Sequence, residues 1–559
     1  MKKSGADIVI ECMLEQGVDT VFGYPGGSIL NIYDSLYRYS DKINHILTAH
    51  EQGAAHAADG YARSSGKVGV VFATSGPGAT NLVTGIATAY MDSVPVVAIT
   101  CNVNTAILGK DSFQEIDIVG ITMPITKHNF LVKKAEDIAD TIRKAFVIAR
   151  SGRPGPVLVD ITKDATDAIT DYEHIPQTTI PERKIEASAA DFTVATEIIK
   201  KSKKPLIYAG GGVISADASE ELSQLAKLID APVTLSLMGL GAFPQHDELF
   251  TGMIGMHGTK ATSMAISECD LLITIGARFS DRATCNINTF AKNAKILQID
   301  ADRAEIDKNV KTDHSIVGDA KAVMTELCRI LKKQKRKEWI SMISKWKEDY
   351  PVEQASGNAL TPCNIMNILN HIDIGKTIFS TDVGQHQMWA AQYLNINSPR
   401  TFLSSGGLGT MGFGLGASIG AQKANPDAVV INITGDGCFH MNMQELSTAA
   451  QQNLPVIDIV MNNNALGMVR QWQRLFYDSR FSSTTLNKKT DYDMVANGLG
   501  ANGYTVSNIT EFETALNDAL SHRDKPSVIN CLIQEDELVL PMVPAGKSIE
   551  EPILDINLH

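Results

Sequence analysis

Apolar runs rich in β-branched residues alternate with alanine-rich stretches along most of this chain. Before about Asp164 the apolar runs are TVFGYPGG, VGVVFATSGPG, VPVVAITCN and GPVLVDIT. A run that is apolar on both faces predicts a strand buried in a parallel sheet, and the stretches between such runs predict the helices that cover the sheet. Residues 1–165 therefore predict one α/β domain.

The same alternation starts twice more along the chain. The runs KPLIYAGGG, APVTLS, DLLITIGA and AKILQIDAD predict a second sheet within 188–335, and AVVINITGDG, LPVIDIVMNNN and SVINCLIQ predict a third within 360–559. The polar, proline-bearing segment TDYEHIPQTTIPERK has no periodicity, which predicts a linker between the first two domains. The predicted fold is α/β, with three doubly wound parallel-sheet domains in series.

Composition narrows the class of protein. A net charge of −13 argues against a dedicated nucleic-acid binder, and the basic run KKQKRK at 332–337 is typical of a solvated helix face. The eight cysteines are scattered singly, without the paired spacing of zinc sites, as expected of buried thiols in a reducing cytosol. The N-terminus leads directly into a predicted amphipathic helix, and no run has transmembrane length. We therefore expect a cytoplasmic protein with neither a membrane nor a nucleic-acid partner.

Candidate chemistry is concentrated where two strands of the third domain end. One strand runs into Gly435, Asp436 and Gly437, and another runs into Asn462–Asn464. Adjacent parallel strands end at the same edge of a sheet, so Asp436 and Asn463 are expected side by side. A carboxylate, an amide oxygen and a backbone carbonyl form an oxygen site suited to Mg²⁺ on a diphosphate. Either piece alone would more often be a structural turn.

The two glycines around Asp436 permit a sharp turn that would aim backbone N–H groups at a ligand. The helix expected near NMQELSTAAQQ would add the positive end of its dipole. A strand, a glycine turn and a helix in this order predict a phosphate cradle, although the lysine of a P-loop is missing.

Gly-Asp-Gly, 24 intervening residues and then Asn-Asn resembles the diphosphate-binding motif of thiamine diphosphate enzymes. The resemblance extends from VFGYPGG to MVPAGKSIEEPI and is closest to the large catalytic subunits of the biosynthetic acetohydroxyacid synthase (acetolactate synthase) family. It implies thiamine diphosphate, Mg²⁺ and FAD as cofactors. It also implies a pyrimidine-binding domain at 1–165, a central FAD-binding domain at 188–335 and a diphosphate- and magnesium-binding domain at 360–559.

The resemblance assigns roles to residues of the first and third domains. Glu51, in AHEQGAAHAADGYAR, matches the glutamate that activates the cofactor, although alone it could be a helix-start glutamate satisfying backbone N–H groups. Catalytic roles also fall to Gln114 and Lys163. Met411 would lie beneath the bent cofactor, where it would otherwise be read as core filler. The implied thiamine diphosphate contacts are Pro25, Val383, Gln385, His386, Gly409, Met411, Asp436, Gly437, Cys438, Asn463, Gly467 and Met468, and the implied metal ligands are Asp436, Asn463 and Ala465.

The same resemblance assigns flavin and substrate contacts. Trp472 would contact the substrate, although a tryptophan is often simply core. Two departures from the family pattern are Ser280, where an aspartate is commoner, and Thr162, which replaces a proline before Lys163. The triple glycine lacks the third glycine of GxGxxG. The implied FAD contacts are Arg153, Gly210, Gly211, Gly212, Thr234, Leu235, Met256, His257, Gly276, Arg278, Asp300 and Asp319, and the implied substrate contacts are Phe113, Met256, Arg282 and Trp472.

The implied activity is decarboxylation of pyruvate followed by condensation of the hydroxyethyl carbanion with a second 2-ketoacid. With pyruvate the product is 2-acetolactate, and with 2-ketobutyrate it is 2-aceto-2-hydroxybutyrate, at the start of branched-chain amino acid biosynthesis. The alternatives are a catabolic acetolactate synthase without FAD, an FAD-linked pyruvate oxidase and a nucleotide-binding regulatory protein that has lost catalysis.

Assembly is the last feature that the resemblance implies. It predicts a homodimer or homotetramer with active sites shared between subunits, and it allows a separate small regulatory subunit.

Overall fold

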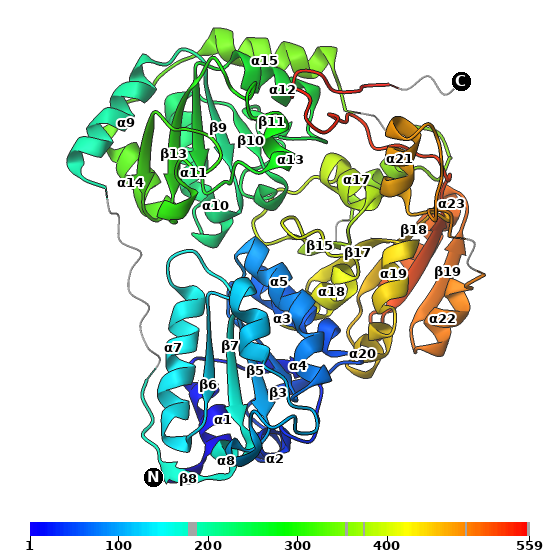
Figure 1. Cartoon of the computed structure of the whole chain (residues 1–559). Helices are drawn as coiled ribbons and strands as arrows, with labels where there is room; N and C mark the ends of the chain where they lie inside the picture. The colour runs from blue at the N-terminus through cyan, green and yellow to red at the C-terminus, as the bar shows by residue number, and fades with distance from the viewer. Residues whose placement is uncertain (177–186, 353–355, 373–374, 487–488, 556–559) are drawn as a thin grey trace.

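The computed structural model describes residues 1–176, 187–352, 356–372, 375–486 and 489–555. Three six-stranded sheets follow one another along the chain, with every pair of neighbouring strands parallel and with helices on both faces (Figure 1). The predicted α/β fold with three doubly wound parallel sheets is therefore confirmed. Within the described residues, no helix has the length and apolar character needed to cross a membrane.

The first sheet has the strand order β3-β2-β4-β5-β7-β6. The chain leaves β2 toward one edge of the sheet and leaves β4 toward the other, so the topological switch point lies between these two strands. The strands are β2 (Thr20–Gly23), β3 (Asn44–Leu47), β4 (Gly69–Ala73), β5 (Val96–Asn102), β6 (His128–Val132) and β7 (Val157–Thr162). The α-helices are α1 (Gly5–Glu15), α2 (Leu30–Arg38), α3 (Glu51–Ser65), α4 (Pro77–Asn81), α5 (Val83–Asp92), α6 (Ile118–Thr122), α7 (Ile138–Arg150) and α8 (Lys163–Asp167).

The third sheet repeats this arrangement as β16-β15-β17-β18-β20-β19, with its switch point between β15 and β17. Its strands are β15 (Thr377–Thr381), β16 (Phe402–Ser404), β17 (Val429–Gly435), β18 (Ile457–Asn462), β19 (Asn502–Val506) and β20 (Ser527–Leu532). Its helices are α16 (Pro362–Leu369), α17 (Gln385–Tyr393), α18 (Phe413–Ala424), α19 (Asp436–Asn442), α20 (Glu445–Gln451), α21 (Gly467–Phe476), α22 (Tyr492–Gly498) and α23 (Ile509–Ser521).

The second sheet has a different order, β11-β10-β9-β12-β13-β14, which is the arrangement of dinucleotide-binding domains. Its switch point lies between β9 and β12. The strands are β9 (Pro205–Ala209), β10 (Val233–Leu235), β11 (Phe250–Met253), β12 (Leu271–Ile275), β13 (Lys295–Asp300) and β14 (His314–Val317). The helices are α9 (Ala189–Lys201), α10 (Gly211–Ser215), α11 (Ser219–Ile229), α12 (Lys260–Glu268), α13 (Asp281–Thr284), α14 (Ala320–Ile330) and α15 (Lys337–Asp349).

The strands that the apolar runs did not predict in the first two domains lie at sheet edges. They are β3 and β6 in the first sheet and β11 and β14 in the second. Three of them are only partly buried, and β6, for example, reads HNFLV. An edge strand has one unpaired side, so its sequence lacks the continuous apolar character on which the prediction depended.

Three local predictions need correction. A short strand, β1 (Lys2–Ser4), precedes the first helix and pairs with β8 (Ile169–Asp171), which lies inside the predicted linker. The linker residues 177–184 lie outside the described part of the chain. The basic run is not simply a solvated helix face, because Arg336 is buried and donates to the carbonyls of Ile199 and Ser202.

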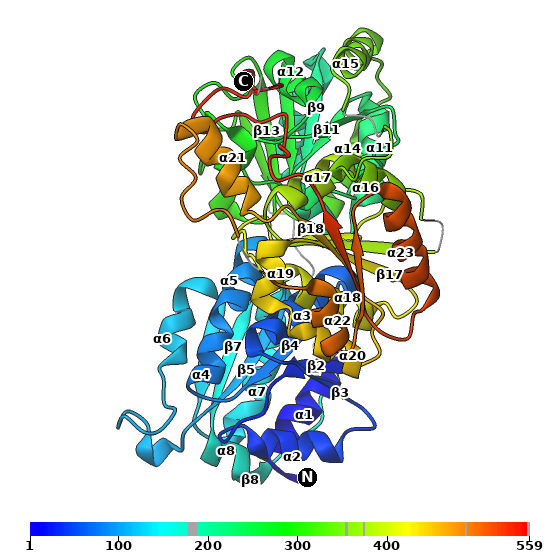
Figure 2. The same ribbon diagram turned by 90° about the vertical axis from the view of Figure 1, so that its right-hand side faces the viewer.

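Helices α3 and α18 join the first and third domains by backbone contact, and they lie side by side in both views (Figure 2). A Cβ added at Gly60 would overlap the carbonyl oxygen of Ala417, and one added at Gly420 would overlap that of Ala57. Any larger residue at either glycine would separate the helices. The glycines therefore allow the two domains to touch.

We expect Gly420→Ala to destabilise the protein by about 1–3 kcal/mol, the usual cost of overpacking a tight interior. Chemical denaturation would measure the loss. The matched control is Gly498→Ala at the end of α22, where nothing lies within 4 Å of the added Cβ. Equal midpoints for the two variants would contradict the helix contact.

Candidate functional site

The strand ends of the third sheet gather the residues expected to bind a diphosphate. Strands β17 and β18 are paired with Gly435 opposite Met461, so Asp436 and Asn463 leave neighbouring strand ends. Asp436 is 3% exposed and Asn463 is 5% exposed. The Nδ2 of Asn463 donates to Gln385 Oε1 at 3.3 Å, which links this edge to the segment that follows β15.

The segment after β15 also contacts the start of α19. The Cys438 thiol donates to the carbonyl oxygen of Val383 at 3.2 Å and lies 3.9 Å from Nε2 of His386. Burial lowers the pKa of His386 to about 3 and raises the pKa of the Cys438 thiol well above its ordinary value. Both groups are therefore uncharged near neutral pH.

The glycines around Asp436 do not act as predicted. Gly435 has φ −99° and ψ 159°, an extended conformation open to any residue, and α19 begins at Asp436 without a sharp turn. The constraint is steric instead. A Cβ at Gly435 would lie 2.8 Å from His386 Nδ1, and a Cβ at Gly437 would lie 2.7 Å from Leu466 Cδ2.

The helix predicted near NMQELSTAAQQ is α20, and it is not the helix that follows the strand. The shorter α19 comes first, so it is α19 that presents its N-terminus at the strand end. The sequence signal for α19 was weak because a Gly-Asp-Gly segment favours a turn over a helix.

Gly437 and Gly467 allow neighbouring side chains to come close to the backbone at this edge of the sheet. An added Cβ at Gly437 would come within 3.7 Å of Met411 Cε, and one at Gly467 would overlap Gln385 Oε1. No group of three or more His, Cys, Asp or Glu side chains is arranged to hold a metal ion by itself within the described residues. A metal beside Asp436 would therefore need neutral protein oxygens and oxygens of the ligand, which is the donor set of Mg²⁺ on a diphosphate.

The remaining third-domain positions border the same edge. Gly409 has φ +73°, which favours glycine there, and Met411 follows it just before α18. The backbone N–H of Ala465 donates to Asn463 Oδ1 at 3.2 Å. Met468 lies on α21 and packs against the hydrophobic core without being fully buried. The strand ends thus bring together most of the residues assigned to the diphosphate end of the cofactor.

The loop that carries Gly409 and Met411 is held by a buried ion group of the first domain. Arg63 bonds to both Asp59 and Asp92, and its Nη1 donates to the carbonyl oxygen of Ser404 at 2.9 Å. Asp92 in turn accepts hydrogen bonds from the backbone N–H groups of Gly406 at 3.2 Å and Gly407 at 2.7 Å. Burial opposes the charge of Arg63, but the two aspartates raise the pKa of its guanidinium above the ordinary value.

A second contact to this loop joins the hydroxyls of Thr88 and Thr410 at 2.7 Å. None of these first-domain residues was among the predicted site residues. The i, i+4 spacing of Asp59 and Arg63 was a usable signal for an ion pair. Nothing in the sequence indicated that Asp92 reaches the third domain.

Glu51 is the first residue of α3 and is 8% exposed. Its carboxylate accepts a hydrogen bond from Asn81 Nδ2 at 2.9 Å, whereas Nδ1 of His50 accepts from the backbone N–H of Gln52. Glu51 is therefore not the side chain that caps its own helix, which removes the main reason to treat it as purely structural.

The other site residues predicted in the first domain lie at different places relative to the start of α3. Pro25 follows β2 at the switch point, and the turn after β4 brings Gly76 against the backbone of Gln114, at 2.9 Å from an added Cβ. Phe113 is 88% exposed in the single chain. Lys163 begins α8, after Thr162 at the end of β7. An added Cβ at Gly78, in the same turn, would lie 3.1 Å from Glu51 Oε1, so this turn reaches both Gln114 and Glu51.

In the second domain the predicted glycines meet at the switch point. Gly210–Gly212 follow β9, Gly276 follows β12, and a Cβ at Gly212 would lie 2.6 Å from Gly276 Cα. Mutual backbone contact thus accounts for these glycines whether or not a ligand is present. The switch point of a sheet with this strand order is nevertheless where a dinucleotide binds, so the position fits FAD.

Several of the polar residues assigned to FAD already form hydrogen bonds or ion pairs with other protein groups. Thr234 donates to the carbonyl of Gly252 at 2.9 Å, and Asp319 caps α14 by accepting from the N–H of Ala322 at 3.1 Å. Burial raises the pKa of Asp300, at the end of β13, to about 6. Arg153 bonds to Glu305 at 2.9 Å and to Ser93 at 2.7 Å, which ties the first domain to the second.

The other flavin-assigned positions lie close to the switch point. Leu235 ends β10 and is buried, and Arg278 follows Gly276, with its carbonyl accepting from Tyr208 Oη at 3.0 Å. Ser280 occupies the N-cap position of α13 without a side-chain cap bond.

Three of the four residues assigned to the substrate converge. Nη1 of Arg282 lies 3.5 Å from the sulfur of Met256, and the Arg282 guanidinium lies over the ring of Trp472 at 5.4 Å from the ring centroid. Trp472 is only partly buried and lies on α21, so it is not plain core. Phe113, the fourth, is on the first domain and is not part of this cluster.

The C-terminal segment passes directly beside the substrate cluster. The N–H of Val543 donates to the carbonyl of Met256 at 2.8 Å, and Nδ1 of His257 lies 3.3 Å from the carbonyl of Pro541. Burial lowers the pKa of His257 to about 4, so the ring is neutral near pH 7.

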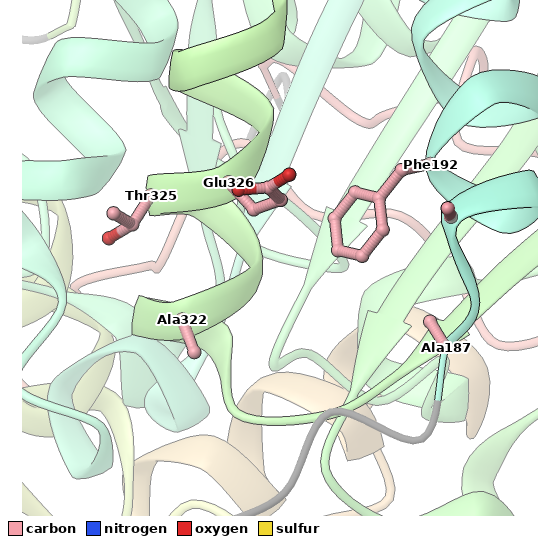
Figure 3. Close-up of a pocket in the computed structure, with 6 residues that line it drawn as sticks. Ala187, Phe192, Ala322, Thr325 and Glu326 are labelled. Carbon is pink, nitrogen blue, oxygen red and sulfur yellow. The ribbon is translucent and has the colours of Figure 1, made fainter.

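A surface hollow lies between α9 and α14 (Figure 3). Phe192 projects from α9 toward Glu326 of α14, with Ala187 and Ala322 beside them and Thr325 turned away. This lining has one carboxylate and no partner group for proton transfer or metal binding. The hollow therefore does not compete with the strand-end site.

Comparison with known proteins gives three domain matches in the order of the three sheets. Residues 3–121 match the N-terminal TPP binding domain of thiamine pyrophosphate enzymes, residues 192–327 match their central domain, and residues 382–531 match their C-terminal TPP binding domain. The chain therefore has the domain organisation of a thiamine pyrophosphate enzyme.

The relatives narrow this class. The chain is 47% identical to a probable acetolactate synthase large subunit of Methanocaldococcus jannaschii, covering 99% of this chain and 96% of the relative. It is 46% identical to the acetolactate synthase large subunit of Buchnera aphidicola and 44% identical to that of Haemophilus influenzae, over 98% and 99% of both chains respectively. The chain belongs to the acetolactate synthase large-subunit family.

The buried ion group yields a prediction about the cofactor loop. Asp92→Asn leaves Arg63 with a weaker partner and turns an amide toward backbone N–H groups, so we expect a loss of about 3–5 kcal/mol of stability, as for other broken buried pairs. Denaturation would measure the loss. Asp171→Asn is the matched control, because its ion pair with Lys2 is exposed and exposed pairs contribute little. Equal effects of the two substitutions would refute the role given to Asp92.

Proposed function

We propose that this protein is the catalytic subunit of a biosynthetic acetolactate synthase. It decarboxylates pyruvate and transfers the remaining two-carbon unit to a second pyruvate, giving 2-acetolactate, or to 2-ketobutyrate, giving 2-aceto-2-hydroxybutyrate. The observation that carries the proposal is Asp436 at the end of β17, beside the end of β18 that leads to Asn463, at the switch point of the third sheet. The full-length similarity to acetolactate synthase large subunits supports the choice of reaction.

Thiamine diphosphate, when bound, supplies the carbon nucleophile that adds to the ketoacid carbonyl. Asp436, Asn463 and the carbonyl of Ala465 would hold Mg²⁺ against the diphosphate, and Met411 would support the cofactor between its two rings. Glu51 would exchange a proton with the aminopyrimidine ring. Gln114 and Lys163 would assist from the first domain, which we propose to be the pyrimidine-binding domain.

The substrate would lie between Arg282 and Trp472. The Arg282 guanidinium offers the paired donors that a ketoacid carboxylate prefers. The indole N–H of Trp472 is buried without a hydrogen-bond partner among the described residues, so one polar group at this site is left for a ligand. The ring would pack against the extra methyl group of 2-ketobutyrate, with Met256 and Phe113 nearby.

FAD is proposed for the central domain at the switch point between β9 and β12. Arg278 supports this placement, because it follows Gly276 just after β12 and a guanidinium there could pair with a flavin diphosphate. We propose that the flavin transfers no electrons in the net reaction. Ser280 would leave this part of the site with one carboxylate fewer than is usual in the family.

We propose a homodimer, or a tetramer built from it, because apolar side chains are exposed on both the first and the third domain. In the first domain they include Ile107, Phe113 and Met123, and in the third they include Val469 and Tyr477. Met123 directly follows α6 and Val469 lies on α21, and these two helices lie toward the same side of the molecule (Figure 2). A second copy would cover both groups and bring Glu51 of one chain to the diphosphate site of the other.

The relatives are named as large subunits. We therefore propose that a separate small regulatory subunit binds this protein. A cytoplasmic location fits the reducing environment that the eight free thiols need.

The test of this function is a product assay with pyruvate and 2-ketobutyrate together, in the presence of thiamine diphosphate and Mg²⁺. We expect both acetohydroxyacids without uptake of oxygen or reduction of a quinone, and a yellow purified protein. Asp436→Ala is the control, because it should remain folded but lose both products along with cofactor binding. Oxygen- or quinone-dependent formation of an acetyl product would identify a pyruvate oxidase instead.

A further inference from the structure

Glu445 is a buried carboxylate of the third domain that reaches into the first. It begins α20, shortly after the helix that starts at Asp436, and its relative exposure is 0%. Its Oε2 accepts from the backbone N–H of Ala49 at 3.1 Å and its Oε1 from that of His50 at 3.0 Å. The hydroxyl of Thr448, one turn along α20, donates to Oε2 at 2.7 Å.

The two backbone groups that Glu445 holds immediately precede Glu51. Ala49 and His50 connect β3 to α3, and the conformation of the residues before a helix sets the direction in which its first side chains leave. His50 also caps the helix, through the bond from Gln52 N–H to its Nδ1. By fixing these two residues, one carboxylate fixes the start of the helix on which Glu51 lies.

The helix contains a gap for this carboxylate. A Cβ added at Gly53 would overlap Oε1 of Glu445. Glycine inside a helix costs roughly 0.5–1 kcal/mol relative to alanine, and here the missing side chain leaves room for Glu445. Gly53 and Glu445 therefore form a matched pair across the domain boundary.

The charge of Glu445 is not favoured by its surroundings, so its ion does not simply stabilise the fold. Burial raises the pKa of its carboxyl above the ordinary value, and the nearby Glu51 acts in the same direction, against the hydrogen bonds from Thr448, Ala49 and His50 that lower it. Burying a carboxylate next to another carboxylate carries a large desolvation and repulsion cost, so it contributes little to holding the two domains together. Its geometry, aimed at two consecutive N–H groups, fits positioning better.

We propose that Glu445 is a positioning residue for Glu51: it holds the backbone of Ala49 and His50 so that Glu51 meets the aminopyrimidine ring of the cofactor at the correct angle. The inference rests on the proposed role of Glu51. The consequence is that a third-domain residue controls proton transfer at Glu51 without touching cofactor or substrate.

The test separates cofactor activation from cofactor binding. In Glu445→Gln an amide replaces one acceptor with a donor that faces the N–H groups, and in Gly53→Ala a methyl group displaces an intact Glu445. For each variant, the exchange rate of the C2 proton of bound thiamine diphosphate is measured by quenched deuterium exchange and NMR. Its dissociation constant is measured by titration with Mg²⁺ present, together with the unfolding midpoint.

We expect both variants to slow C2 exchange by about 10- to 100-fold, the range for small misplacement of a reacting group, with the dissociation constant unchanged within about twofold. Thr448→Val removes only the bond from the hydroxyl and should give a smaller reduction in the same direction. If exchange, affinity and the unfolding midpoint all fall together, or if exchange stays at the wild-type rate, Glu445 does not position Glu51.

Glu51→Gln distinguishes failure of this inference from failure of the proposed function. If Glu51→Gln itself exchanges the C2 proton at the wild-type rate, Glu51 is not the activator and its proposed role is wrong. If Glu51→Gln is slow while Glu445→Gln and Gly53→Ala are fast, only the positioning inference is overturned.

Discussion

Backbone contact between α3 and α18 is the constraint on which the arrangement of the site depends. The contact is possible because glycines stand where the helices cross, at Gly60 and Gly420. It fixes more than the two helices, because Glu51 begins α3, and Met411 comes just before α18. One interface thus sets the positions of the proposed activating carboxylate and of the residue proposed to support the cofactor.

Each domain braces a functional segment of the other around this interface. Asp92 and Arg63 of the first domain hold the loop that leads to Met411, and Glu445 of the third holds the residues before Glu51. Buried ionic groups are poor sources of net stability, since their desolvation offsets their attraction. Their value here is geometric, because each bond is directed at particular backbone atoms.

Sequence reasoning found the fold through the buried central strands, whose apolar runs are continuous. It also located Asp436 and Asn463, because neighbouring parallel strands end at one edge. It placed the wrong helix after β17, since a glycine-rich segment does not look helical, and it gave Gly435 a turn that the backbone does not make. The residues that join the two domains could not be predicted from the sequence. Their contacts, such as those from Asp92 to Gly407 and from Glu445 to His50, link positions separated by hundreds of residues.

Glu51 accepts a hydrogen bond from Asn81 of its own domain, and Phe113 of the same domain is exposed in the single chain. The proposal that a second chain completes the active site is compatible with both observations.

The most direct measurement mixes Glu51→Gln and Asp436→Ala chains, each inactive alone, under conditions that exchange subunits. A heterodimer then has one site with both lesions and one with neither, so we expect partial recovery of acetolactate formation. Exchange verified by tagged pull-down with no recovery of activity would contradict the shared site.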